Sequence, residues 1–520
     1  MTGRPDLRVG IDVGGTHTDA AVLDTSDQLV AKAKVPTSSD VTEGVTAALA
    51  AVLREPGVDP PRVSHVMLGT THATNAVLER RSLQRVAVLR LAAPATLTVR
   101  PLLAWPADLR AAVSAGEAIV GGGIEVDGRE LAPLDEDAVR RFLAEHAGAV
   151  DGVAITGMFS PAAPEQELRA RELAAEELGD VHVSLSHEVG SLGLIERENA
   201  TVLNAALAAV AQDVAAALES ALEAHGLDAI VMFAQNDGTL MALDYAVRNP
   251  VLTIGSGPAN SLRGAAFLSG VSDALVADVG GTSTDIGALV SGFPRESSAA
   301  VEIGGIRTNF RMPDIVAIAV GGGTIVATDD DGVRVGPQSV GFALTERALV
   351  FGGEVPTLTD AAVAAGRARV GDRAPHVNGG GPDLERALAG AEELIAGAVD
   401  RAKTQRGDVP LVAVGGGSFL VPDELPGVSE VVRPAHYDVA NAIGAAIAQV
   451  GGRWEEVVRI DRDREQAIEQ ACDRARRRAI AAGADADRVE IVELEEVPLA
   501  YHTEPSVRLR VKAVGPLSWL

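Results

Sequence analysis

The chain has 520 residues, enough for two or three domains with a substantial buried core. It carries 45 Lys and Arg against 72 Asp and Glu, a formal net charge of -27, and only 3% of its residues are aromatic. This balance argues against a nucleic-acid-binding protein, which needs a basic surface and stacking side chains, and against attachment to anionic membranes.

The single cysteine, Cys472, leaves no internal disulfide and no cysteine-based metal site. The first residues lack the pattern of a signal peptide. The longest uncharged apolar run, residues 315–327, is too short to span a bilayer. We therefore expect a cytoplasmic protein without a membrane anchor.

One sequence of eight residues occurs twice. Residues 12–19 read Asp-Val-Gly-Gly-Thr-His-Thr-Asp, and residues 278–285 differ from them at a single position. In each copy the glycines lie between two short apolar runs, which predicts two strands joined by a tight turn. Glycines let backbone amides approach a ligand and hydroxyls add donors, so the pattern indicates a phosphate-binding hairpin. The aspartate that opens each copy, Asp12 or Asp278, is a ligand type that hydrated Mg²⁺ uses.

The remainder of the first half alternates strands and helices. Gly69–Glu79 follows a buried strand and opens a helix, which we interpret either as a well-capped helix or as a site for polar ligands at a helix start. The pattern predicts strands at 29–35, 63–68, 86–91, 153–155 and 181–185, and helices at 41–53 (capped by Asp40), 136–145 and 169–178.

The second half repeats this alternation around further glycine clusters at 321–324 and 415–417. We expect a long helix from about 197 to 225 and a helix that starts at Gly255–Ala259. The other predicted elements are a strand at 230–234, a hairpin turn at 329–331, a loop at 375–382, a helix at 384–401, a strand at 411–414, a helix at 439–450 with small residues on one face, a charged helix at 462–482, and strands at 489–497 and 506–514.

Two similar halves, each opened by a phosphate hairpin, predict an α/β duplication with a nucleotide in the cleft between them. We divide the chain into an N-terminal half at 1–190 with an insertion near 95–150, a second half at 191–450, and a small C-terminal α+β segment at 451–520. A dinucleotide-binding fold would need Gly-x-Gly-x-x-Gly between a strand and a helix, whereas these glycines lie between two strands.

On these segments the chain resembles the hydantoinase A/5-oxoprolinase family, within the superfamily of sugar kinases, heat-shock chaperones and actin. The resemblance implies two RNase H-like halves of the actin-like ATPase type, with ATP in the cleft. The segments that carry it occur in the family's order, at Asp12–Asp19, Gly69–Leu78, Ser186–Glu188, Thr201–Asn204, Ser256–Ala259, Asp278–Asp285, Gly321–Thr324 and Thr359–Asp360.

The chain departs from the family pattern at three places. Position 17 is often Phe in the family and is His17 here, and the histidine of the family's Asp-Ile-His stretch is replaced by Val316. A family segment that contains cysteine is replaced by residues 342–353. These departures leave ATP handling intact and indicate a short, divergent branch.

The resemblance implies ATP-dependent opening of a cyclic amide such as a hydantoin or 5-oxoproline. Phosphorylation of the amide oxygen would give an imidate phosphate, which water attacks more readily than the amide itself. We expect Asp12 and Asp278 to be the catalytic residues and to hold Mg²⁺, while Asp19 and Asp285 either orient the hairpins or cap their turns. Expected ATP contacts are Gly14, Gly15, Thr16, Thr18, Gly280, Gly281, Thr282, Ser283, Thr284, Gly322 and Gly323, with Gly415, Gly416, Gly417 and Ser418 at the adenosine; expected substrate contacts are Thr70, Thr71 and Asn75.

Relatives of this kind often act with a separate B-type subunit, so we expect a possible partner protein and an oligomer. Three alternatives remain open: a small-molecule kinase of the same superfamily, a non-catalytic ATP-driven switch, and a subunit of a related carboxylase. A stable phosphorylated product would identify a kinase. Nucleotide-dependent binding without turnover stimulated by a substrate would identify a switch.

Overall fold

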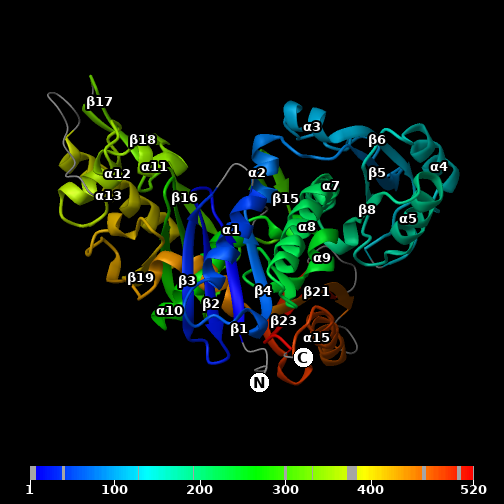
Figure 1. Cartoon of the computed structure of the whole chain (residues 1–520). Helices are drawn as coiled ribbons and strands as arrows, with labels where there is room; N and C mark the ends of the chain where they lie inside the picture. The colour runs from blue at the N-terminus through cyan, green and yellow to red at the C-terminus, as the bar shows by residue number, and fades with distance from the viewer. Residues whose placement is uncertain are drawn as a thin grey trace.

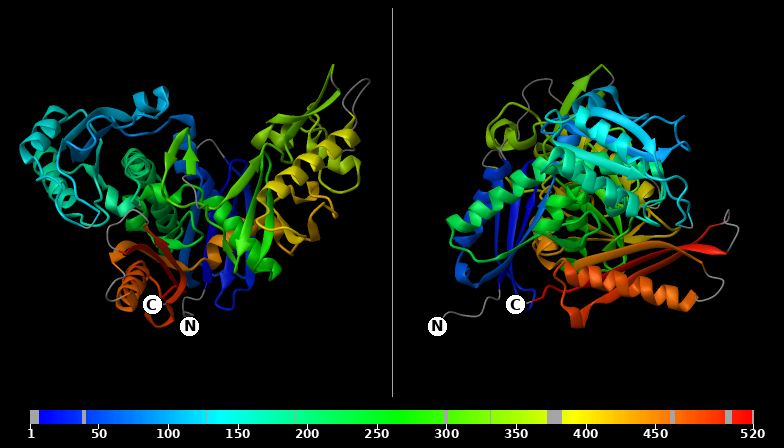
Figure 2. Two further views of the ribbon diagram at one scale, coloured as in Figure 1. Left: turned by 180° about the vertical axis from the view of Figure 1, so that it is seen from behind. Right: turned by 90° about the vertical axis from the view of Figure 1, so that its right-hand side faces the viewer.

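The computed structural model describes residues 7–37, 41–126, 128–190, 192–297, 301–330, 332–371, 383–459, 464–499 and 505–518. The N-terminal strands lie at the centre of the molecule, with the yellow and orange part of the second half on one side and a cyan body on the other (Figure 1). The orange and red C-terminal segment lies at the lower end of the molecule, close to the N-terminal strands (Figure 2).

The central sheet has nine strands in the order β22-β23-β21-β10-β9-β4-β1-β2-β3. Its middle strands are buried almost throughout. The strand bounds are β1 Leu7–Val13, β2 His17–Asp24, β3 Leu29–Pro36, β4 Val63–Thr70, β9 Ile230–Ala234, β10 Leu240–Ala242, β21 Val450–Arg459, β22 Glu490–Pro498 and β23 Ser506–Gly515.

A second sheet repeats the arrangement of the first. In both sheets a hairpin pairs on one side with a parallel strand and on the other with an antiparallel strand. Thus β4-β1-β2-β3 corresponds to β19-β11-β12-β16, which confirms the predicted duplication of two RNase H-like halves. The strands are β11 Ala274–Val279, β12 Thr284–Val290, β13 Phe293–Pro294, β16 Ile315–Ile318, β19 Val409–Val414 and β20 Val428–Val432.

A third, fully parallel sheet forms the cyan body of Figure 1, in the order β6-β5-β7-β8. One face packs on α4 and α5, and the other on α7. Its bounds are β5 Val86–Ala93, α3 Ala107–Val113, β6 Ser114–Gly121, α4 Glu136–Glu145, β7 Gly152–Gly157, α5 Glu165–Leu178, β8 His182–Leu185 and α7 Leu194–Ala206. Strand β6 was not expected, because its sequence is rich in Ala and Gly, which have low strand propensity.

The predicted helix from 197 to 225 is wrong in one respect, because it is two helices. Helices α7 and α8 (Ala208–Ala224) bend by 46° at a break around Leu207. Asn204, one turn earlier, hydrogen-bonds to Ser184, to the carbonyl of Arg248 and to the amide of Val251, and these contacts fix the chain at the bend. Among the described helices none alone is long and apolar enough to cross a membrane; α7 and α8 reach that composition only as a bent pair.

Most of the other elements predicted from the sequence are present, whereas strands β10, β20 and β21 were not predicted. Helices α1 and α13 cover the predicted ranges, and β17 and β18 form the predicted hairpin, although Asp331, Asp40 and the loop at 375–382 lie outside the described residues. Their bounds are α1 Val41–Leu53, η1 Pro60–Arg62, α2 His72–Glu79, α6 Ser186–Val189, α9 Leu243–Arg248, η2 Pro250–Thr253, α10 Ser256–Ser269, β14 Val301–Ile303, β15 Ile306–Thr308, β17 Thr324–Asp329, β18 Gly332–Ser339, η3 Gly341–Ala343, α11 Leu344–Arg347, η4 Leu349–Phe351, α12 Leu358–Ala364, α13 Leu384–Ala402, η5 Ser418–Leu420, η6 Tyr437–Val439, α14 Ala440–Ile447, α15 Arg464–Ala481 and η7 Ala486–Arg488.

Helices α10 and α14 cross in close contact through glycines. A Cβ added at Gly264 would lie 1.8 Å from the carbonyl oxygen of Ala440, and one added at Gly444 would lie 1.9 Å from that of Asn260. The small-residue face predicted on the second helix is therefore used for close packing. The crossing brings the first turns of both helices under the β1–β2 hairpin.

The central sheet contains strands from both sides of the predicted domain boundaries at residues 190 and 450. Strands β9 and β10, from the predicted second half, and β21–β23, from the predicted C-terminal segment, all belong to the central sheet. Ion pairs connect these strands, since the buried Asp237 after β9 bonds to the partly exposed Arg453 on β21 and to the buried Lys512 on β23. The three-part division therefore stays a prediction about folding units, and the sheet topology cuts across it.

Candidate functional site

The two copies of the eight-residue sequence form equivalent hairpins whose tips touch. Each turn is closed by a backbone hydrogen bond, from Gly14 N to His17 O at 3.0 Å and from Gly280 N to Ser283 O at 2.9 Å. A Cβ added at Gly281 would lie 2.8 Å from Oγ1 of Thr16, so the second tip rests against the first. The structure thus brings together the two motifs that lie far apart in sequence.

Strand register aligns the acidic residues in two rows. In the first sheet Gly69, Asp12, Asp19 and Lys34 lie directly opposite one another across β4, β1, β2 and β3. In the second sheet the corresponding row is Val414, Asp278, Asp285 and Ala317. Residues directly opposite in antiparallel strands point to the same face, so each row gathers its side chains at the site.

Asp12 is held by carboxamides from two helices. It is 3% exposed, and it accepts from Asn260 Nδ2 of α10 at 3.0 Å and from Asn441 Nδ2 of α14 at 3.1 Å. The pKa of Asp12 is raised to about 6, chiefly by burial; the charges of Asp19 and Asp278 contribute to this shift, and the hydrogen bonds from the two carboxamides oppose it. A cation, or its hydration waters, would stabilise the negative charge of a carboxylate buried in this way.

Gly69 leaves the space that Asp12 and Asn260 occupy. A Cβ added at Gly69 would lie 2.3 Å from Asp12 Oδ1 and 2.2 Å from Asn260 Nδ2. We expect Gly69→Ala to displace this carboxylate and to weaken Mg²⁺-dependent nucleotide binding roughly tenfold or more, at a stability cost of about 1–3 kcal/mol. Calorimetric titration with ATP and Mg²⁺ and a thermal melt would measure both effects.

Gly257→Ala is the matched control, because its Cβ would meet Thr71 and Asp12 at ordinary distances of 3.8 and 3.9 Å. Equal losses in the two variants would contradict the role given to Gly69.

The acidic pair of the second hairpin is also perturbed. Burial raises the pKa of Asp278 despite a hydrogen bond from Ser261 Oγ at 2.5 Å. Burial and the nearby charge of Asp278 raise the pKa of Asp285 to about 7. Both hairpins therefore hold their leading aspartates in surroundings that disfavour an uncompensated negative charge.

The predicted phosphate contacts fall into two groups. Within the described residues, no protein group accepts from the amides of Gly15, Thr16, Gly281 and Thr282, at the hairpin tips. Other predicted donors already have partners: Gly14 and Gly280 close the turns, Thr18 Oγ1 contacts Thr37 Oγ1 at 3.2 Å, and Thr284 Oγ1 donates to Val320 O at 2.6 Å.

The cluster at 321–324 supports the second hairpin from behind. The amide of Gly322 donates to Gly280 O at 3.0 Å and that of Gly323 to Gly281 O at 2.7 Å. Both amides are therefore used in holding the hairpin, and contact of Gly322 and Gly323 with ATP stays a prediction. Thr359, from the family's Thr-Asp pair, also bonds to Gly322 O.

The loop Gly415–Ser418 lies against Asp278. Gly415 has φ +84°, and a Cβ there would lie 2.4 Å from Asp278 Oδ1. Gly417 N donates to Val279 O and Ser418 N to Gly415 O, whereas a Cβ at Gly416 would have no neighbour within 4 Å. The loop borders open space only at Gly416, and its contact with adenosine stays a prediction.

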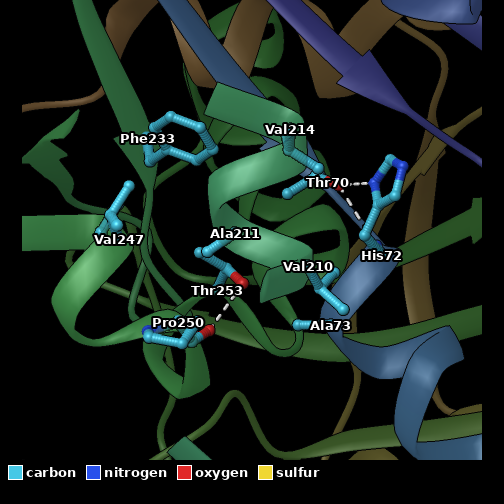
Figure 3. Close-up of a pocket in the computed structure, with 11 residues that line it drawn as sticks. Thr70, His72, Ala73, Val210, Ala211, Val214, Phe233, Val247, Pro250 and Thr253 are labelled. Atoms are coloured by element: carbon cyan, nitrogen blue, oxygen red, sulfur yellow. Dashed lines mark hydrogen bonds between the residues drawn. The ribbon is translucent and has the colours of Figure 1, made fainter. Parts of the chain in front are cut away.

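The predicted substrate residues differ in their availability. Thr70 hydrogen-bonds to His72, and Thr71 Oγ1 donates to Val13 O at 3.1 Å, so both hydroxyls tie α2 to the site. Asn75 is exposed. A small apolar pocket lies beside Thr70 and His72, with Phe233, Val214 and Val247 in its wall (Figure 3). Substrate contact by the three predicted residues stays a prediction.

The Ser186–Glu188 segment lies away from the hairpins, in a buried cluster at the end of β8. Ser186 Oγ and His187 Nδ1 bond to Glu167, which is fully buried, at 2.5 and 2.6 Å. Burial opposes ionisation of Glu167, but the hydrogen bond and charge of His187 bring its pKa below the usual value. Across the described ranges, no three His, Cys, Asp or Glu side chains converge as a ready-made metal site.

Sequence reasoning missed several residues at the site. Asn260, Asn441 and Ser261 bind the leading aspartates, and Thr37 Oγ1 donates to Gly14 O at 2.9 Å. Lys34 pairs with Asp19 at 2.5 Å. A signal existed only for Lys34 and Thr37, which end the strand after the first hairpin; the asparagines come from helices distant in sequence.

Family comparisons agree with this geometry. A model of the hydantoinase/oxoprolinase N-terminal region matches residues 8–178, and a hydantoinase/oxoprolinase model matches residues 197–381. The chain is 28% identical over 392 residues to the acetophenone carboxylase gamma subunit of Aromatoleum aromaticum, covering 69% of this chain and 53% of that protein. It is 28% identical over 389 residues to caprolactamase subunit alpha of Pseudomonas jessenii, covering 70% and 55%.

A third relative is 5-oxoprolinase of Saccharomyces cerevisiae, 26% identical over 413 residues, covering 70% of this chain and 32% of the enzyme. The chain thus spans about half the length of the first two relatives and about a third of the length of the 5-oxoprolinase. Among solved structures, ATP-dependent caprolactamase from Pseudomonas jessenii superposes with TM-score 0.75 and 23% identity, covering 98% of this chain and 88% of the other. Nucleotide-free acetone carboxylase gives TM-score 0.72 and 17% identity, with the same coverage, so both share the fold.

Proposed function

Because the chain belongs to the hydantoinase/oxoprolinase family, we propose that it is an ATP-dependent hydrolase, or the ATP-using subunit of one, that phosphorylates and opens a cyclic amide. The observation that carries the proposal is the contact between the two hairpin tips, with Asp12 and Asp278 at their bases. The amides at both tips, from which no described protein group accepts, lie at this contact and would suit the oxygens of a triphosphate.

The proposed step transfers the γ-phosphoryl group to the amide oxygen. The oxygen–phosphorus bond forms as the bond from phosphorus to the ADP oxygen breaks, and ADP leaves with the electron pair. After loss of the amide proton the product is an imidate phosphate. A first water adds to its carbon, and the carbon–nitrogen bond breaks, so that the nitrogen leaves as the ring-opened amine and the carbon becomes an acyl phosphate. A second water then attacks the acyl phosphate and releases phosphate and a carboxylate. The chain's contribution is to position the triphosphate and to neutralise its charge.

The residues present fit a divalent cation. Asp12 is buried with a raised pKa, and within the described residues nothing donates to the neighbouring Oδ1 of Asn260. Mg²⁺ usually binds one or two carboxylates together with waters and phosphate oxygens, so a larger acidic cluster is unnecessary. We propose that Asp12 and Asp278 hold Mg²⁺, which would supply charge neutralisation on the phosphates.

Phosphate release from ATP tests the proposal. Purified protein with ATP and Mg²⁺ is assayed against hydantoins, 5-oxoproline, lactams of increasing ring size and small sugars. The double variant Asp12→Asn, Asp278→Asn serves as the blank. We expect one cyclic amide to stimulate phosphate release, and we expect this stimulation to be absent in the double variant. A stable phosphorylated sugar would instead identify a kinase, and ATP binding without stimulation by any compound would favour a switch.

A second candidate function follows from the similarity to a carboxylase subunit, which equals the similarity to the caprolactamase subunit. Phosphorylation of a carbonyl oxygen would also activate a ketone, so acetophenone and acetone with bicarbonate belong in the panel. Both relatives are named as subunits. We therefore propose a multi-subunit assembly with a B-type partner, acting in the cytoplasm.

A further inference from the structure

We propose that Lys34 is a nucleotide-binding residue whose ammonium group contacts the β- or γ-phosphate of ATP at the hairpin junction. The inference rests on the nucleotide-binding part of the proposed function and is independent of which compound is phosphorylated. None of the sequence motifs includes Lys34, because it follows the first eight-residue copy by a full strand.

Strand register places Lys34 at the site. It lies directly opposite Asp19, which lies directly opposite Asp12, so the three side chains share one face of neighbouring strands. Adjacent strands are about 4.8 Å apart, so the backbone of Lys34 is only about 10 Å from that of Asp12, which a lysine side chain largely spans. The side chain of Lys34 is 31% exposed and its Nζ lies 2.5 Å from Asp19 Oδ1.

The two halves differ at the position of Lys34. The residue equivalent to Lys34 in the second row is Ala317, and Lys34 is the only cationic side chain in either row of described residues. The rows contain four carboxylates: Asp12, Asp19, Asp278 and Asp285. A triphosphate adds further negative charge, so the one lysine becomes essential to bind it in this acidic surrounding.

The competing explanation is that Lys34 only neutralises Asp19. Asp19 is 4% exposed, and a buried carboxylate without a partner would be costly. The two explanations differ in what happens when both charges are removed. If Lys34 serves only Asp19, the double variant Lys34→Met, Asp19→Asn recovers nucleotide binding. If Lys34 binds phosphate, it does not.

The experiment measures Kd for ATP, ADP and AMP by calorimetry with the full chain and Mg²⁺, together with melting temperatures. For Lys34→Met we expect Kd for ATP to rise about 10- to 100-fold, the range of a hydrogen bond to a charged group, with AMP affinity unchanged. Lys34→Arg should keep most of the affinity. Lys32→Met is the matched control, since Lys32 lies two residues earlier on the same strand face and pairs with Asp438 at 2.7 Å.

Loss of ATP affinity in Lys34→Met that persists in the double variant supports the proposal, provided that Lys32→Met binds normally and all variants melt cooperatively. Recovery in the double variant, or equal losses for ATP and AMP, overturns it. Absence of ATP binding by the wild-type protein overturns both this inference and the proposed function. Normal ATP binding without stimulation by any cyclic amide overturns only the proposed substrate class.

Discussion

Replacing Asp12 with asparagine is expected to reduce ATP turnover about 10³-fold or more while the protein stays folded, because a metal-binding carboxylate at a phosphoryl-transfer site contributes several kcal/mol. The substitution preserves shape. Asn260 can rotate its carboxamide, since within the described residues its Oδ1 has no donor, and so accept from the new amide. Steady-state phosphate release, compared between variant and wild type, gives the factor.

The same variant should be the more stable protein in the absence of metal at neutral pH. The pKa of Asp12 is raised from 3.8 to about 6 in the folded state, so the folded protein binds its proton more tightly than the unfolded chain. Stability of the wild type is therefore lost as pH rises from about 4 to 6, a difference worth up to about 3 kcal/mol. Asparagine does not titrate, so the melting temperature of the variant should exceed that of the wild type at pH 8 and approach it near pH 4.

Melting curves in EDTA at several pH values measure this difference. A variant less stable than the wild type at pH 8 would contradict the account of Asp12 as a strained buried carboxylate. Full ATP turnover by the Asp12→Asn variant would contradict a catalytic role for Asp12, whatever the stability of the variant.

The largest effect on stability is expected for Glu198→Gln. Glu198 on α7 forms a two-pronged ion pair with Arg90 on β5, at 2.6 and 2.7 Å, and both side chains are 0% exposed. Loss of one charge leaves the other buried without compensation, at a cost of about 3–5 kcal/mol. Because this pair joins the four-stranded sheet to the helix that covers it, we expect the midpoint of urea denaturation to fall sharply.

The control is Glu117→Gln, which breaks the partly exposed pair with Arg110 and should cost about 0–1 kcal/mol. A double variant, Arg90→Met with Glu198→Met, should recover part of the loss because both charges are removed together. Equal costs at Glu198 and Glu117 would show that burial does not set the strength of the pair.

The parts of the site that depend on neighbouring residues in the sequence were predictable. The repeated residues Asp12–Asp19 and Asp278–Asp285 predicted both hairpins and their leading aspartates, because a tight turn between apolar strands is specified by neighbouring residues. The family resemblance predicted two similar α/β halves, and the matching order of strands in the two sheets confirms the duplication. The sequence did not show that the amides of Gly322 and Gly323 support the second hairpin, because glycine richness does not tell whether an amide faces a ligand or another carbonyl.

The sequence by itself determined many of the strands, the two hairpins and the aspartates at their bases, since periodicity and turn chemistry act over a few residues. Only the tertiary structure decided which strands are neighbours: β9, β10 and β21–β23 join the first sheet across the expected boundaries. It also decided that Asn260 and Asn441, 248 and 429 residues away, hold Asp12. Strand pairing and helix crossing depend on packing between distant segments, and no local pattern encodes the partner.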